Sequence, residues 1–103
     1  MNAQLSTCQS VDETARRQFE AAWRAGAPVA IEAQLPPPDD ARFLPTLEEL
    51  VHIELELGWK AGRQLRVEEY LTRFPALNEQ PVVARLLEQE YHVRHKFGDR
   101  PPA

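Results

Sequence analysis

Two stretches of the chain, FEAAWRAGAPVAIEAQLP (residues 19–36) and LELGWKAGRQLRVEEYLT (residues 55–72), align without a gap at an offset of 36 residues. Trp23 falls on Trp59, and the three residues after each tryptophan read Arg-Ala-Gly and Lys-Ala-Gly. The whole sequence of 103 residues holds two tryptophans and four glycines, so such a match rarely arises by chance. We interpret the chain as a tandem repeat in which each copy is one supersecondary unit.

The same offset, applied once more, begins a third copy that stops before its second half. It places Leu55 on Tyr91 and Gly62 on Gly98. We predict one helical repeat domain over residues 10–98, made of copy one (11–45), copy two (46–81) and a partial copy three (82–98), between a flexible N-terminus (1–9) and a tail or linker (99–103).

Each copy is predicted to contain a longer amphipathic helix that ends at a glycine, followed by a short second helix. Glycine readily takes the left-handed conformation that closes a helix C-terminus. In copy two the short helix is VEEYLTRFP (67–75), whose four apolar residues recur at i, i+3, i+4 and i+7. Copy one has Gln-Leu-Pro (34–36) in place of the matching Tyr-Leu-Thr, so its short helix is left open.

The segment VHIELELGW (51–59) alternates apolar and polar residues, which is the pattern of a strand. It lies in the repeat frame with two segments of helical character, ARRQFEAAW (15–23) and LLEQEYHVRH (86–95), and the repeat favours a helix. The connector LPPPDDARFLP (35–45) is predicted to be irregular for most of its length, because proline lacks an amide donor. We therefore predict an all-α domain of four to five helices, built from 36-residue helix–Gly–helix repeats.

Local signals predict where the helices begin. Ser10 and Thr46 each precede a glutamate by three residues, as in the S/T-x-x-E capping box. Asn78 is predicted to cap the last helix, with Pro81 tolerated in its first turn. The residues predicted to form the core are Trp23, Leu55, Trp59, Tyr70, Leu71, Phe74, Leu86 and Leu87.

The charge of the chain is modest and unevenly placed. The formal net charge is −4 and the isoelectric point is about 5.3, with −6 on residues 1–58 and +2 on residues 59–103. A nucleic-acid-binding domain normally has a denser basic face and a higher isoelectric point. We keep a small stand-alone helical nucleic-acid-binding protein as the alternative function, and its candidate basic residues are Arg85, Arg94, Lys96 and Arg100.

The sequence shows no targeting segment and no membrane-spanning run. It has no stretch of about 18 apolar residues, and its N-terminus lacks the apolar region of a signal peptide. The single cysteine, Cys8, excludes an internal disulfide and fits a reducing compartment. We therefore expect a cytoplasmic protein.

Several catalytic signatures are absent from the sequence. It has no phosphate-binding glycine loop, no H-E-x-x-H, no G-x-S-x-G and no C-x-x-C. Acidic pairs such as Glu54 and Glu56 are interpreted as solvated helix faces. Glu88, His92 and His95 share a helix face at metal-ligand spacing, but we favour a plain helix surface, because the spacing is common. We assign no catalytic residue, metal or cofactor.

The segment FEAAWRAG…IEAQL, followed by LVHIELELGWKAGRQLRVEEYLTRFPAL, resembles the region N-terminal to the catalytic domain in planctomycete-type bacterial serine/threonine protein kinases. The resemblance covers roughly residues 15–98, and EEYLxRFP is its most specific part. Arg66 departs from it, because a capping Ser or Thr is usual at that place. The matching residues are Leu50, Glu54, Leu55, Glu56, Leu57, Gly62, Glu68, Glu69, Tyr70, Leu71, Arg73, Phe74 and Pro75.

The resemblance implies a non-catalytic interaction or regulatory module at the N-terminus of a kinase or related signalling protein. Its expected partners are a protein, a second copy of the chain, or the attached kinase domain. The incomplete third copy predicts an apolar helix face that lacks its neighbour, which is where we expect association. The residues predicted to form this interaction face are Leu86, Leu87, Tyr91 and Phe97.

Overall fold

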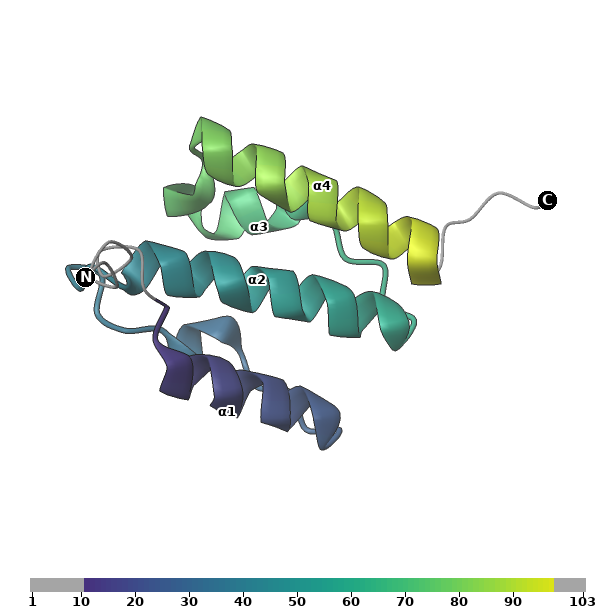
Figure 1. The fold of residues 1–103 in the computed structure, drawn as a ribbon, viewed down its shortest axis with the longest axis horizontal. Helices are drawn as coiled ribbons and strands as arrows, with labels where there is room; N and C mark the ends of the chain where they lie inside the picture. Colours follow the sequence, from purple (N-terminus) through teal and green to yellow (C-terminus); the bar gives the residue numbers. More distant parts are fainter. Residues whose placement is uncertain (1–10, 98–103) are drawn as a thin grey trace, which may run out of the picture. The chain divides into compact units, whose positions relative to one another are not determined.

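The computed structural model describes residues 11–97, which form four α-helices and two 3₁₀ turns and contain no strand (Figure 1). The elements are α1 (Glu13–Arg24), η2 (Ile31–Gln34), α2 (Phe43–Lys60), α3 (Val67–Arg73), η3 (Pro75–Leu77) and α4 (Gln80–Phe97). The predicted all-α class is confirmed, and the ambiguous segment 51–59 is helical throughout. The chain divides into two compact units, Met1–Leu50 and Val51–Ala103, and the division falls inside α2.

In the first unit, the start of α1 is capped by Asp12. Its carboxylate accepts a hydrogen bond from the amide of Ala15 at 3.2 Å. The two predicted capping boxes are therefore wrong. Ser10 lies outside the described residues, and the cap is Asp12. Thr46 lies inside α2, where its buried hydroxyl accepts a hydrogen bond from the Asp12 amide at 2.8 Å.

The second helix of copy one is a single 3₁₀ turn, η2. Leu35 follows it in an extended conformation, with φ −82° and ψ 144°. This ending has a direct cause, because the residue before a proline is pushed out of the helical region and Pro36 has no amide to donate. Ile31 in η2 is fully buried, and η2 lies against α1.

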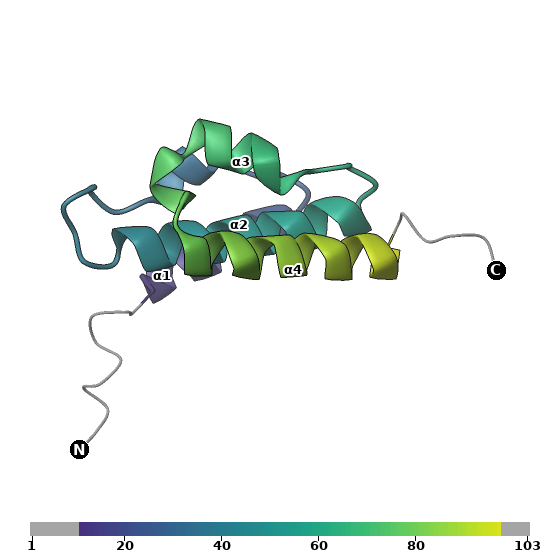
Figure 2. The ribbon, with the colours of Figure 1, turned by 90° about the horizontal axis from the view of Figure 1, so that it is seen from above.

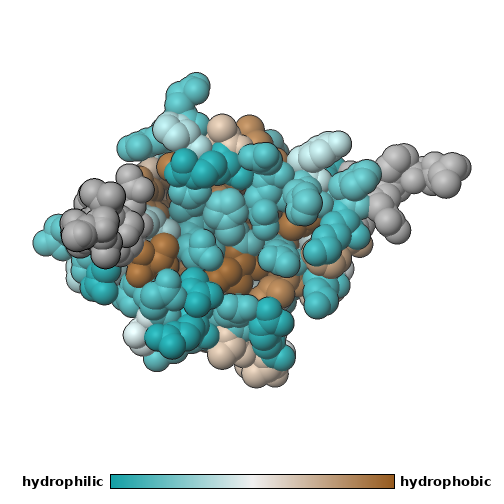
Figure 3. Space-filling model, in the orientation of Figure 1, coloured by the Kyte–Doolittle hydropathy of each residue, from teal (hydrophilic) through white to brown (hydrophobic). Residues whose placement is uncertain are grey.

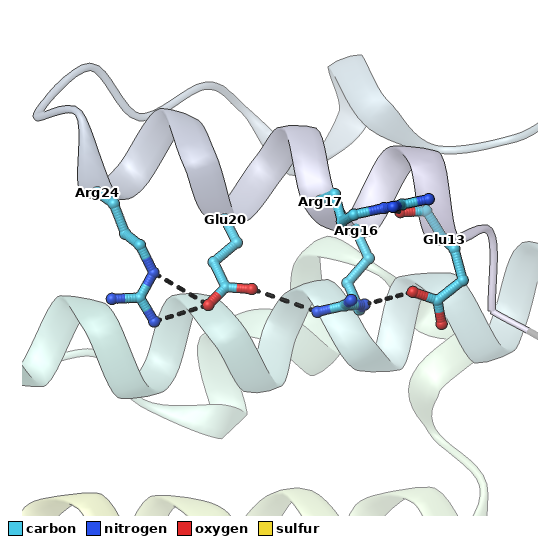
Figure 4. Close-up of polar contacts among 5 residues, drawn as sticks. All are labelled: Glu13, Arg16, Arg17, Glu20 and Arg24. Atoms are coloured by element: carbon cyan, nitrogen blue, oxygen red, sulfur yellow. Dashed lines mark hydrogen bonds and ion pairs between the residues drawn. The ribbon is translucent and has the colours of Figure 1, made fainter.

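A row of ion pairs runs along the polar face of α1 (Figure 4). Arg16 bonds Glu13 at 2.8 Å and Glu20 at 3.2 Å, and Arg24 bonds Glu20 at 2.7 Å. Exposed pairs of this kind contribute little to stability. Both of these arginines are nevertheless paired with carboxylates of their own helix.

The two long helices that precede the glycines end in the same way. Trp23 and Trp59 lie in the last turns of α1 and α2, and each accepts a bond at its carbonyl from a glycine amide three residues later. Gly26 has φ 80° and Gly62 has φ 93°. Both glycines are thus in the left-handed region, which residues with a Cβ adopt at a cost.

In the second unit, α3 and α4 run antiparallel, and η3 lies at the reversal between them (Figures 1 and 2). Asn78 closes η3 with a bond from its amide to the carbonyl of Pro75. Because Glu79 then precedes α4, the prediction that Asn78 caps this helix is wrong. Pro81 does lie in the first turn, as predicted.

Most of the predicted core is buried. Leu71 is only half-buried, and Leu87 is 52% exposed, so its assignment to the core is wrong. Leu87 follows Leu86 by one residue, which turns its side chain about 100° around the helix axis. The predicted core residues found buried are Trp23, Leu55, Trp59, Tyr70, Phe74 and Leu86.

Candidate interaction surface

The second unit carries one face of α4 on which large apolar side chains are exposed. Leu87 is 52% exposed and Tyr91 is 73% exposed. The ring of Tyr91 stacks on that of His95, with centroids 6.2 Å apart and planes 14° apart. Exposed Ala84 lies one turn before Leu87. Residues three or four apart on a helix are neighbours, so Ala84, Leu87, Tyr91 and His95 form one stripe, here called the α4 row.

Two of the four residues predicted to form the interaction face are exposed. Leu86 is fully buried and cannot contribute to an exposed face. Phe97 is half-buried, with the ammonium of Lys96 5.1 Å from its ring centroid. Leu87 and Tyr91 remain. Leu87, Tyr91 and His95 are spaced at i, i+4 and i+8 in the sequence. Leu86 does not belong to this series, so the spacing could have identified the row without it.

The opposite face of α4 is fixed in the unit by buried apolar residues and by one carboxylate. Val82, Leu86 and Val93 are buried. Glu90 accepts a hydrogen bond at 2.7 Å from the amide of Val67, the first residue of α3. Arg66 precedes that helix and makes no side-chain cap, so a carboxylate from α4 caps α3 instead. Sequence reasoning missed this cap, because it looks for capping groups near the helix start.

Glu90 also belongs to a short chain of contacts. Its second oxygen bonds the guanidinium of Arg94 at 2.8 Å. Arg94 lies over the ring of Trp59, 5.5 Å from the centroid. The Trp59 indole donates to the carbonyl of Leu65 at 2.9 Å, in the loop before α3. These contacts join the end of α2, the loop, α3 and α4, and they fix which side of α4 points outward.

We expect Glu90→Ala to lower the free energy of unfolding by about 2 kcal/mol, because the Val67 amide loses its acceptor and Arg94 loses its carboxylate. Glu88→Ala is the matched control on the exposed side of the same helix, and we expect a change below about 0.5 kcal/mol. Urea denaturation followed by circular dichroism measures both. Equal losses in the two variants would contradict the capping role.

A second carboxylate–hydrogen-bond contact lies between α2 and α3. The buried Tyr70 hydroxyl donates to the carboxylate of Glu54 at 2.5 Å. Burial first, and then this hydrogen bond, raise the pKa of Tyr70 above its usual value. Glu54 is half-buried, so its interpretation as part of a solvated face is wrong. Its role is to accept a hydrogen bond from a buried phenol.

The candidate metal ligands do not form a metal site. Within residues 11–97, no three histidine, cysteine, aspartate or glutamate side chains are grouped so as to hold a metal ion. Glu88, His92 and His95 are exposed on the surface of α4.

Two of the four basic residues of the alternative function contact other side chains of the described part of the chain. Arg94 bonds Glu90 and covers Trp59, and Lys96 lies over Phe97. Arg85 is exposed on α4, and Arg100 lies outside the described residues. On the face drawn in Figure 3, hydrophilic side chains predominate and the hydrophobic areas are small.

A scan against protein-family models and searches of curated proteins and of solved structures found no match to this chain. None of the helices in the part of the chain that the structure describes is long and apolar enough to cross a membrane.

Proposed function

We propose that the chain is a non-catalytic protein-interaction module. The observation that carries this proposal is the exposure of Leu87 and Tyr91 side by side on a helix whose other face is buried. Large exposed apolar side chains that cluster on one face are typical of interaction sites. Tyrosine is also enriched among the residues that contribute most to binding at interfaces.

The biological setting is part of the same proposal. The resemblance of EEYLxRFP (68–75) to the region before bacterial serine/threonine kinase domains supports a regulatory role in a kinase or related signalling protein. Such a module works in the cytoplasm. Its partner is a protein, which includes an attached kinase domain or a second copy of the chain.

The polar contacts weigh against the nucleic-acid alternative. Nucleic-acid binding depends on basic side chains that neutralise phosphates. Arg16 and Arg24 are held by acids of their own helix, and Arg94 is held by Glu90.

Photocrosslinking tests the proposed function. A benzoylphenylalanine is placed at Ala84, in the α4 row, and in a second variant at Gln18, which is exposed on α1. We expect irradiation of cells to give a defined protein adduct from position 84 and none from position 18. The adduct's mass then shows whether the partner is this chain or another protein. If position 84 gives no adduct above the position 18 control, the proposal is wrong.

A further inference from the structure

The α4 row is self-complementary when two copies of it are placed antiparallel. Each residue of a helix advances about 1.5 Å along the axis. A two-fold axis beside Tyr91 therefore brings Tyr91 against Tyr91 of the second copy, and it brings Leu87 level with His95 of the second copy. The two exposed apolar side chains are then covered together.

A carboxylate and an imidazole exposed on α4 favour this direction. Glu88 precedes Tyr91 by three residues, and His95 follows it by four. Both are exposed, and their positions in the helical repeat place them on the same side of Tyr91, which is the flank they share. In an antiparallel pair, Glu88 of each copy faces the imidazole of His95 of the other copy, twice by symmetry. A parallel two-fold pair would place the two copies of this flank on opposite sides of the interface, where Glu88 and His95 do not meet.

We propose that a second copy of this chain docks on the α4 row, with the two α4 helices antiparallel and Glu88 of each facing His95 of the other. This inference rests on the proposed function and specifies a second copy of the chain as the partner that binds the α4 row. Such an interface is isologous, because the same patch serves both copies, and two-fold dimers are the commonest oligomers. One helix from each copy buries less than the roughly 1,200 Å² of a standard interface, so the dimer is reversible.

Sedimentation velocity of the purified full chain tests the inference over a range of about 10 μM to about 1 mM, which is suited to a weak association. We expect the mean mass to rise from the 11.8 kDa of the monomer towards twice that value. Tyr91→Glu should remain monomeric over the whole range, with an unchanged far-ultraviolet circular dichroism spectrum. Gln18→Glu on α1 adds the same charge elsewhere and should dimerise like the wild type.

A charge exchange tests the predicted direction of the helices. Glu88→Lys and His95→Glu should each raise the dimer dissociation constant by about tenfold, since each places like or unpaired groups in contact. The double variant Glu88→Lys/His95→Glu should restore dimerisation to within about threefold of the wild type. The introduced lysine of each copy then faces the introduced glutamate of the other copy.

The results that overturn the inference differ from those that overturn the proposed function. A wild-type monomer at the highest concentration overturns self-docking, as does dimerisation that Tyr91→Glu leaves unchanged. Failure of the double variant to restore the dimer overturns the antiparallel pairing. In each case, an adduct with another protein from position 84 would leave the interaction module standing. Only the absence of any adduct removes both.

Discussion

Leu86→Ala is expected to lower the free energy of unfolding by about 3 kcal/mol, whereas Leu87→Ala beside it should change this free energy by less than about 0.5 kcal/mol. The two leucines are adjacent in the sequence, but Leu86 is fully buried and Leu87 is 52% exposed. Truncating the first leaves a cavity in the core of the second unit. Truncating the second removes a side chain that solvent already reaches.

Urea denaturation of both variants, followed by circular dichroism at a concentration below that of self-association, measures the difference. The pair of variants also serves as its own control, because the chemical change and the helix are the same. Equal losses would mean that α4 is turned differently about its axis. The α4 row would then not be the exposed face, and the proposed interaction surface would be wrong.

Alkaline pH is expected to destabilise the protein through Tyr70. Burial and the hydrogen bond to Glu54 raise the pKa of this phenol in the folded state above the value of 10.0 that an unperturbed tyrosine has. The unfolded chain therefore releases the proton first as the pH rises. The stabilisation is fully present below about pH 10, and above it the free energy of unfolding falls by about 1.4 kcal/mol per pH unit from this one group.

Stability measured at intervals between about pH 9 and pH 12 tests this expectation. Tyr70→Phe should lose the part of the slope that Tyr70 contributes, and at neutral pH it should cost about 2 kcal/mol, because Glu54 loses a hydrogen bond to its charged carboxylate. Tyr91→Phe is the matched control, since Tyr91 is 73% exposed. If Tyr70→Phe keeps the full slope of the wild type, the buried hydrogen bond is not its cause.

The parts of the fold that depend on local pattern could be predicted from the sequence. The helices follow from the spacing of apolar residues, and the ends of α1 and α2 follow from Gly26 and Gly62. The tryptophans of the repeat are buried, as large aromatic residues at recurring positions usually are. The short η2 turn follows from the prolines after it, although the sequence alone left that helix open.

The parts that depend on distant residues could not be predicted in this way. The amide of Asp12, the residue that caps α1, is held by Thr46, 34 residues further on. Glu90 caps α3 from 23 residues away. A capping motif describes only neighbours in the sequence, so it cannot find contacts that tertiary packing brings together.

Within α4, too, the local pattern predicts the helix, whereas tertiary packing decides which of its residues are exposed. The sequence places two adjacent leucines in a helix, and both are apolar enough for a core. The choice between them depends on which residues pack beneath α4, and the buried Val82 and Val93 share the side of Leu86. Of the residues predicted for this face, Leu87 and Tyr91 are exposed and Leu86 is buried, and the interaction itself stays a prediction.

The most direct test of the interaction surface is the rate at which a thiol in the α4 row reacts with N-ethylmaleimide inside cells. The variant Cys8→Ser/Ala84→Cys carries one cysteine in the row, and Cys8→Ser/Gln18→Cys carries one on the exposed side of α1. Each rate is compared with that of the dilute purified protein. If the α4 row is an interaction surface, position 84 should react about tenfold more slowly in cells while position 18 reacts equally in both settings. Equal rates at position 84 in cells and in dilute solution would contradict it.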